Sequence, residues 1–174
     1  MKGFCELILG GARSGKSSLA EQRALGSGLE CVYVATATAD DSEMRERIAH
    51  HQLRRDTGWT LVEEPVALAD SLQNQHGSGR CIVVDCLTLW LSNCLHHQCW
   101  QHESERLLEV LPSLSGHIIL VSNETGLGVV PMGELSRQFV DEAGFLHQRL
   151  ATLCQQVTLT VAGLPLSLKP SQEN

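Results

Sequence analysis

The sequence predicts an α/β fold of three layers, in which helices cover both faces of a mostly parallel sheet. Five short apolar runs are typical of buried strands, at residues 5–9, 31–35, 81–85, 117–121 and 157–161. Their hydropathy is continuous rather than alternating, as expected for strands that are covered on both faces. Helical patterns lie between these runs, so strand and helix alternate and right-handed crossovers are expected.

The remaining elements follow from periodicity in the same way. Helices are expected over 16–26, 41–56, 65–75, 86–97, 102–113 and 132–155, and the last carries the apolar stripe Phe139, Ala143, Leu146 and Leu150. Residues 60–63 could add a short strand. The stretch 170–174 has the composition of a frayed tail.

Length and composition limit the class of protein. A chain of 174 residues with 43% hydrophobic content suits a single domain over 1–174. Thirteen Lys and Arg face 20 Asp and Glu, and a net charge of −7 makes nucleic acid an unexpected partner. No run approaches the roughly 20 apolar residues of a membrane span, and no secretory leader is visible, so we expect a cytoplasmic protein.

The cysteine pattern supports the same compartment. Seven cysteines, an odd number, occur without a CxxC pair. Three of them, Cys5, Cys31 and Cys81, lie in expected strands. We therefore expect reduced and packed thiols rather than disulfides.

A phosphate-binding loop follows the first expected strand. Residues 10–17 read GGARSGKS and fit the pattern GxxxxGK[ST] between a strand and a helix, which is the context that this motif requires. Glycines allow backbone N–H groups to converge on an anion, and the helix N-terminus adds partial positive charge. Lys16 is expected to reach the β- and γ-phosphates, and Ser17 to ligate Mg²⁺.

A carboxylate for the same metal is expected at the end of a neighbouring strand. Asp85 closes the apolar run CIVV at 81–84, which is the usual place of a Walker B acid. A strand-end Asp that caps the following helix is the competing interpretation. These two motifs together predict a nucleotide-binding domain and nothing narrower.

The segment 43–55, EMRERIAHHQLRR, places two histidines among arginines. Helical spacing puts Arg47 and Arg54 on the face of His50, and the same arginines, with Arg55, beside His51, so spacing does not choose between the two histidines. Nearby guanidinium groups favour a neutral imidazole, and they bind phosphate in a bidentate manner. A neutral imidazole beside a phosphate site can act as a nucleophile, although a solvated basic helix face has the same pattern.

Two other polar segments are candidates for a ligand-binding or metal site. Residues 123–128, NETGLG, follow an expected strand at the edge where α/β sheets bind ligands, so they are either a substrate or nucleotide loop or a plain turn. The segment 96–102, HHQCWQH, lacks the spacing of a tetrahedral metal site, and we expect a polar connection there.

Together these segments resemble the bifunctional adenosylcobinamide kinase / adenosylcobinamide-phosphate guanylyltransferase family of cobalamin biosynthesis. The resemblance runs in order through GGARSGKS at 10–17, YVATA at 33–37 and the His-rich segment at 43–55. It continues through WTLVEEP at 59–65, DCLTLWLSN at 85–93, SNETGLGVVP at 122–131 and RQFVDEAGFLHQRLA at 137–151. It covers nearly the whole chain, and the His-rich and SNETG segments are far more specific than the phosphate loop.

The resemblance implies a RecA-like P-loop fold, a homotrimer and two reactions. In the first, ATP or GTP phosphorylates adenosylcobinamide. In the second, GTP donates GMP to adenosylcobinamide phosphate through a covalent guanylyl-histidine, and adenosylcobinamide-GDP and pyrophosphate are formed. The resemblance assigns that histidine to the first of the pair, which is His50 here.

The resemblance also implies the residues of the nucleotide site. The residues expected to contact the nucleotide or its metal ion are Gly10, Gly11, Ala12, Arg13, Ser14, Gly15, Lys16, Ser17, Ala35, Thr36, Ala37, His51, Gln52, Leu53, Arg54, Glu63 and Asp85. Glu63 could read the N1–H and N2–H₂ of guanine. Two other classes remain as alternatives: a small-molecule P-loop kinase with one activity, and a RecA-like ATPase or binding module.

Overall fold

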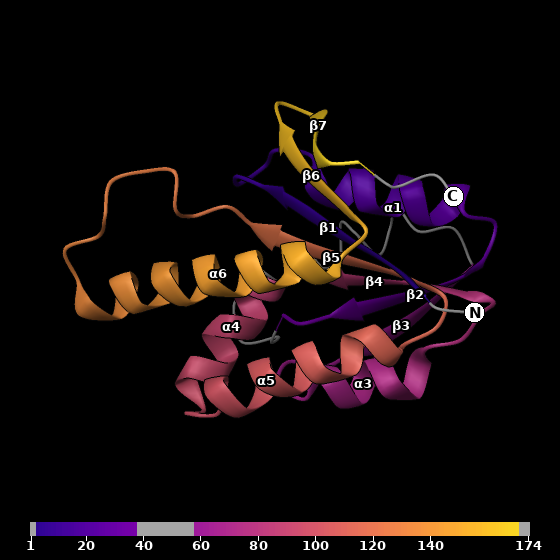
Figure 1. Ribbon diagram of the computed structural model, residues 1–174, viewed down its shortest axis with the longest axis horizontal. Helices are drawn as coiled ribbons and strands as arrows, with labels where there is room; N and C mark the ends of the chain where they lie inside the picture. The colour runs from indigo at the N-terminus through magenta and orange to yellow at the C-terminus, as the bar shows by residue number, and fades with distance from the viewer. Residues whose placement is uncertain (1–2, 38–57, 171–174) are drawn as a thin grey trace.

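The computed structural model describes residues 3–37 and 58–170 (Figure 1). Within these residues one sheet is formed in the order β3-β2-β4-β5-β1-β6-β7. Its strands are β1 (Phe4–Gly10), β2 (Glu30–Ala35), β3 (Trp59–Glu63), β4 (Arg80–Asp85), β5 (His117–Asn123), β6 (Gln156–Val161) and β7 (Leu164–Lys169). All neighbouring strands are parallel except the pair β6 and β7.

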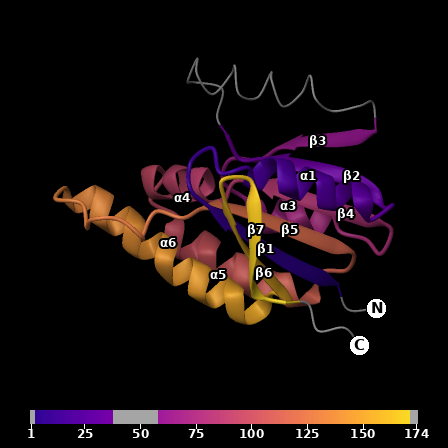
Figure 2. The same cartoon turned by 90° about the horizontal axis from the view of Figure 1, so that it is seen from above.

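Helices cover both faces of this sheet, which makes three layers. The described helices are α1 (Lys16–Gly26), α3 (Leu68–Gln75), α4 (Leu87–His96), α5 (Trp100–Val110) and α6 (Glu134–Leu153), with a 3₁₀ turn at Leu111–Ser113. Figures 1 and 2 show α1 on one face and α3, α4, α5 and α6 on the other. The predicted three-layer, mostly parallel α/β fold is confirmed.

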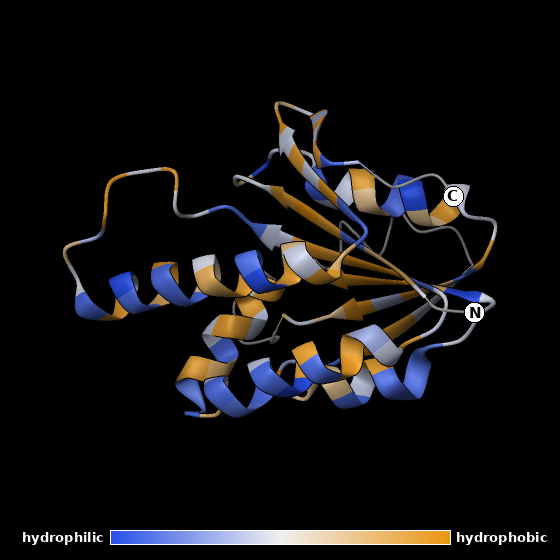
Figure 3. Ribbon diagram, viewed as in Figure 1, coloured by the Kyte–Doolittle hydropathy of each residue, from blue (hydrophilic) through white to orange (hydrophobic). Residues whose placement is uncertain are grey.

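Alternate residues of the central strands β1, β2, β4 and β5 pack into two separate cores. Along β1 and β5, Leu7, Leu9 and Leu120 pack under α3 to α6, whereas Ile8 and Val121 pack under α1. This alternation explains why the strands are apolar throughout, because neither face meets water. Figure 3 shows the same pattern as strands coloured mostly hydrophobic between helices that carry both classes of residue.

Most predicted elements are present at or near their expected bounds. The five strands are confirmed, and the optional strand at 60–63 is present as β3. The helix expected over 65–75 begins later, at Leu68, because the Glu64 carboxylate accepts hydrogen bonds from the N–H groups of Val66 and Ala67. The helix expected over 41–56 and most of the tail expected at 170–174 lie outside the described residues.

The strand β7 is absent from the sequence prediction. It lies at the edge of the sheet and pairs antiparallel with β6 through a short turn at Ala162 and Gly163. Pro165 is compatible with this position because an edge strand has N–H groups that no neighbour requires. The segment LPLSLK lacks the continuous apolar run that identifies the interior strands, and five of its six residues are exposed.

Candidate active site

The phosphate loop connects the end of β1 to the start of α1, at the carboxyl edge of the parallel strands. Two residues of the loop have left-handed backbone, Arg13 with φ 55° and Gly15 with φ 94°. A Cβ on Gly10 would lie 2.3 Å from Ser14 Oγ and 2.7 Å from the Thr160 carbonyl oxygen. The close approach at Gly10 and the positive φ at Gly15 explain why glycine stands at both positions.

Lys16 folds back over this loop. Its side chain is largely buried, and Nζ donates to the Gly11 carbonyl oxygen at 3.0 Å. Ser14 Oγ is also buried, and it has no hydrogen-bond partner among the described residues. An ammonium group and an orphaned hydroxyl within one turn of loop are suited to an anion with several oxygens.

The β6–β7 turn supports the loop from one side. The Gly163 N–H donates to the Ser14 carbonyl oxygen at 2.8 Å, and a Cβ on Gly15 would lie 3.1 Å from Gly163 Cα. The loop therefore rests on the hairpin that the sequence prediction lacked.

Asp85 lies at the end of β4, as predicted. Its Oδ2 accepts a hydrogen bond from the Tyr33 hydroxyl at 2.9 Å. Strand β4 is separated from β1 by β5 alone, so the carboxylate lies two strand spacings, about 10 Å, from the phosphate-loop strand. A carboxylate and the Ser17 hydroxyl at one edge provide the oxygen ligands that Mg²⁺ prefers.

The segment after β2 is fixed to the end of β4. Thr36 is fully buried; its Oγ1 donates to the Cys86 carbonyl oxygen at 2.7 Å and accepts from the Cys86 N–H at 2.9 Å. Asn93 of α4 donates to the carbonyl oxygens of Thr36 at 2.8 Å and Pro65 at 3.0 Å. The backbone of 35–37 is thus held rigidly beside Asp85.

The pKa of the Cys86 thiol is shifted by its burial and by the charges around it. Burial raises its pKa, and the Asp85 carboxylate raises it further, while hydrogen bonds from Thr88 and Leu89 and the Lys16 ammonium act in the opposite direction.

The end of β5 lies between these two strands and contacts the phosphate loop directly. The Glu124 N–H donates to the Gly10 carbonyl oxygen at 2.9 Å, and Glu124 Oε1 accepts from the Gly126 N–H at 2.5 Å. One residue before the strand end, Ser122 Oγ forms a buried hydrogen bond of 2.7 Å with His147 Nε2 of α6. Burial lowers the pKa of His147, and the Glu124 carboxylate partly opposes this.

The structure brings part of the predicted nucleotide site together. Residues 10–17, residues 35–37 and Asp85 gather at one edge of the sheet, and Asn123 lies opposite Gly10 in the β1–β5 register. Glu63 ends the edge strand β3 and is exposed, four strand spacings or about 19 Å from β1. His50, His51, Gln52, Leu53 and Arg54 lie outside the described residues.

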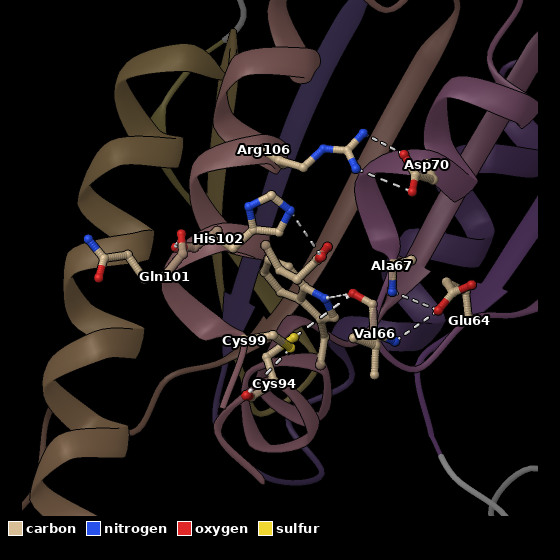
Figure 4. A network of polar contacts seen from close by, with 12 residues as sticks. Glu64, Val66, Ala67, Asp70, Cys94, Cys99, Gln101, His102 and Arg106 are labelled. Atoms are coloured by element: carbon tan, nitrogen blue, oxygen red, sulfur yellow. Dashed lines mark hydrogen bonds and ion pairs between the residues drawn. The ribbon is translucent and has the colours of Figure 1, made fainter. Parts of the chain in front are cut away.

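Features outside this edge have structural explanations. In the close-up of Figure 4, Cys99 donates to the Cys94 carbonyl oxygen and His102 lies near Glu103, and the described residues contain no cluster suited to a metal. All seven cysteines are free thiols. A cavity of about 380 Å³ lies near the amino end of β1, beside Phe4 and Lys169, and none of residues 10–17, residues 35–37, Glu63 and Asp85 lines it.

Sequence reasoning missed three residues that build this site. Tyr33 and Asn93 lie in segments that carry the family resemblance but were not predicted as site residues, and Gly163 lies in none of these segments. A signal existed for Asn93, because it is an amide at the end of LTLWLSN, a segment in which the large side chains are Leu and Trp. No local signal identifies Gly163, because its role depends on a strand pairing distant from the loop.

Comparisons with known proteins agree with one another. A family model described as cobinamide kinase / cobinamide phosphate guanyltransferase matches residues 6–168. The bifunctional adenosylcobalamin biosynthesis protein CobP of Pseudomonas aeruginosa is 60% identical over 167 residues, which cover 94% of this chain and 96% of CobP. The protein CobU of Escherichia coli, with the same descriptive name, is 31% identical over 94% of this chain and 98% of its own length.

A solved structure shares the architecture at low identity. The RadB recombinase aligns with a TM-score of 0.53 and 20% identity, over 91% of this chain and 74% of that chain. This likeness confirms the predicted RecA-like fold. At this identity it does not indicate the activity of the chain.

Proposed function

Because this chain belongs to the cobinamide kinase / cobinamide phosphate guanyltransferase family, we propose that it is the bifunctional enzyme that performs both reactions. It phosphorylates adenosylcobinamide with ATP or GTP. It then transfers GMP from GTP to adenosylcobinamide phosphate, which yields adenosylcobinamide-GDP and pyrophosphate. The observation that carries this proposal is the match across 6–168 together with the loop geometry around Lys16.

The nucleotide phosphates bind at residues 10–17. Loop N–H groups, the amino end of α1 and the Lys16 ammonium supply positive charge to the phosphate oxygens. The positive φ of Gly15 and the hydrogen bond from the Gly163 N–H to the Ser14 carbonyl oxygen fix the backbone of this loop. Residues 35–37 and 51–54 complete the site, and Glu63 reads the guanine edge of a nucleotide that lies across the sheet towards β3.

Ser17 and Asp85 would hold Mg²⁺. The hydroxyl and the carboxylate fit a hard cation, and the Tyr33 hydroxyl orients Asp85 through Oδ2. When bound, the ion neutralises phosphate charge in the transition state of either reaction.

His50 is the nucleophile of the guanylyl transfer. Its neutral imidazole attacks the α-phosphorus of GTP, the bond to the bridging oxygen breaks, and pyrophosphate leaves. The phosphate of adenosylcobinamide phosphate then attacks the guanylylated His50 and releases the imidazole. The arginines at 47, 54 and 55 contact phosphate oxygens during both steps.

We further propose a cytoplasmic homotrimer. No described helix is long and apolar enough to cross a membrane. Large apolar side chains stand exposed on the single chain, including Val129 and Met132, each 96% exposed, and Leu164, 72% exposed. Surfaces of this kind are typical of subunit interfaces.

A product assay tests the proposal. The purified protein is incubated with adenosylcobinamide, Mg²⁺ and ATP, and the products are separated by chromatography and identified by mass. Adenosylcobinamide phosphate is expected first, and addition of GTP converts it to adenosylcobinamide-GDP. A kinase product that GTP never converts would instead favour the single-activity kinase, and hydrolysis without any corrin product would favour the ATPase or binding module.

A further inference from the structure

The two proposed reactions differ in their need for a base. An alcohol must lose its proton as it attacks the γ-phosphorus, and a positioned base assists that loss. Neither attack in the guanylyl transfer has this requirement, because the attacking nitrogen of a neutral imidazole and the attacking oxygen of an ionised phosphate monoester carry no proton that must be lost. A residue that serves as base should therefore matter to the kinase reaction alone.

Carboxylates at the carboxyl edge of the sheet are the candidates among the described residues. Strands are spaced by about 4.8 Å, so position in the sheet orders them by distance from the phosphate-loop strand. Glu124 follows β5, the immediate neighbour of β1, whereas Asp85 lies on the next strand and Glu63 on the fourth. The Glu124 N–H bond to the Gly10 carbonyl oxygen places its backbone against the loop itself.

The other carboxylates at this edge already have assignments. Asp85 accepts from the Tyr33 hydroxyl and belongs to the metal site proposed above. Glu64 accepts from the N–H groups of Val66 and Ala67 through one oxygen, and Figure 4 shows it turned towards this backbone at the start of α3. Glu63 is too distant from the phosphate loop.

Glu124 is held in place without being neutralised. The Gly126 N–H binds one carboxylate oxygen, Oε1, at 2.5 Å. In residues 3–37 and 58–170 no Lys, Arg or His forms an ion pair with it. The strand end beneath it is fixed by the buried Ser122–His147 bond and by the Asn123 N–H, which donates to Thr88 Oγ1 at 3.4 Å.

The surroundings of Glu124 leave room for an acceptor. Glu124 itself is half-buried, and Thr125, Gly126 and Leu127, which follow it directly, are exposed, Leu127 at 82%. A large substrate can therefore approach the phosphate loop over this segment without displacing packed side chains.

We propose that Glu124 is the general base of the kinase reaction, an inference that rests on the proposed function. The proton of the aminopropanol hydroxyl of adenosylcobinamide passes to the Glu124 carboxylate. The hydroxyl oxygen forms a bond to the γ-phosphorus while the bond from that phosphorus to the β,γ-bridging oxygen breaks. The nucleoside diphosphate leaves, and the protonated carboxyl later returns its proton to solvent.

The test separates the two reactions in one variant. Glu124→Gln keeps the shape and the Gly126 hydrogen bond but cannot accept the proton. Its kinase kcat, measured with adenosylcobinamide and ATP, should fall by about 100-fold or more. Its guanylyl transfer, measured with supplied adenosylcobinamide phosphate and GTP, should stay near that of the unchanged protein, and Glu124→Asp should recover part of the kinase rate.

Controls keep the outcomes distinct. Glu134→Gln removes a carboxylate from the exposed start of α6 and should change neither reaction. Equal losses of both activities in Glu124→Gln would show that the residue only shapes the loop, and no loss would exclude it as the base; either result overturns the inference. If the unchanged protein lacks kinase activity, the proposed function fails and the inference fails with it.

Discussion

Single residues at the phosphate loop are constrained by space and backbone rather than by chemistry alone. The motif predicted glycines there, and the structure explains them by a φ of 94° at Gly15 and by crowding at Gly10. The pattern did not reveal that Gly15 also packs against Gly163. The identity of a loop residue can thus be read from sequence, whereas its distant neighbour cannot.

Gly15→Ala should weaken nucleotide binding. The new methyl group would lie 3.1 Å from Gly163 Cα, and alanine is strained at the positive φ of this position, so the loop must shift. We also expect the free energy of unfolding to fall by at least about 1 kcal/mol. Titration calorimetry with GTP and Mg²⁺ measures the affinity. In the control, Gly144→Ala in α6, the methyl group meets nothing within 4 Å, and stability should rise by about 0.5–1 kcal/mol.

Two histidines, the buried His147 and the half-buried His117, make stability depend on pH. Burial lowers the pKa of His117, helped by Arg23, and that of His147. Below the unfolded pKa of about 6.5 the unfolded chain takes up protons that the folded chain does not, so the free energy of unfolding falls as pH decreases below that value.

Urea unfolding at pH 5.5 and pH 7.5 measures this effect. His147→Asn, which can still bond Ser122 but cannot titrate, should lose less stability than the unchanged protein between the two conditions. The difference for one histidine is at most about 1.4 kcal/mol per unit of pKa shift. An identical loss in both proteins would contradict the role of His147.

At the scale of elements, apolar content made the five interior strands predictable and left β7 unseen. Interior strands are apolar because both faces are buried, which is a local signal. Strand β7 is an edge strand with mostly exposed residues, so its existence depends on pairing with β6. The start of α3 was misplaced because a side chain, Glu64, holds the preceding turn.

Lys169 should be the main anchor of β7. Its Nζ donates to the Cys154 carbonyl oxygen at 2.6 Å and to the Ala151 carbonyl oxygen at 3.0 Å, at the end of α6. Lys169→Met should lower the free energy of unfolding by about 1–3 kcal/mol, because two carbonyl groups lose a charged donor. Ser167→Ala, on the same strand, should be close to neutral in the same denaturation experiment.

At the scale of the whole molecule, the part of the chain that the structure describes exposes apolar side chains in more than one place. Among residues 3–37 and 58–170, exposed apolar side chains gather in the loop before α6, with Val129 and Met132, and on the β6–β7 hairpin, with Leu164 and Leu166. Sequence periodicity could not separate these from core residues. The resemblance predicts a homotrimer, and we propose that neighbouring subunits cover these side chains.

Sedimentation velocity should show the proposed homotrimer. At micromolar concentration the main species should have the mass of three chains of 19.0 kDa. Single chains that persist across the concentration range would contradict that assembly and would leave the exposed apolar surface for another partner.

The transfer of GMP through His50 is the central claim, and trapping the intermediate tests it most directly. The protein is incubated with Mg²⁺ and GTP labelled at the α-phosphate, denatured, and mapped for the label. We expect label on His50 that is labile in acid, stable in alkali and absent from His50→Ala. Tight GTP binding with no label on the protein would contradict transfer through His50 and would leave it as a residue that orients phosphate.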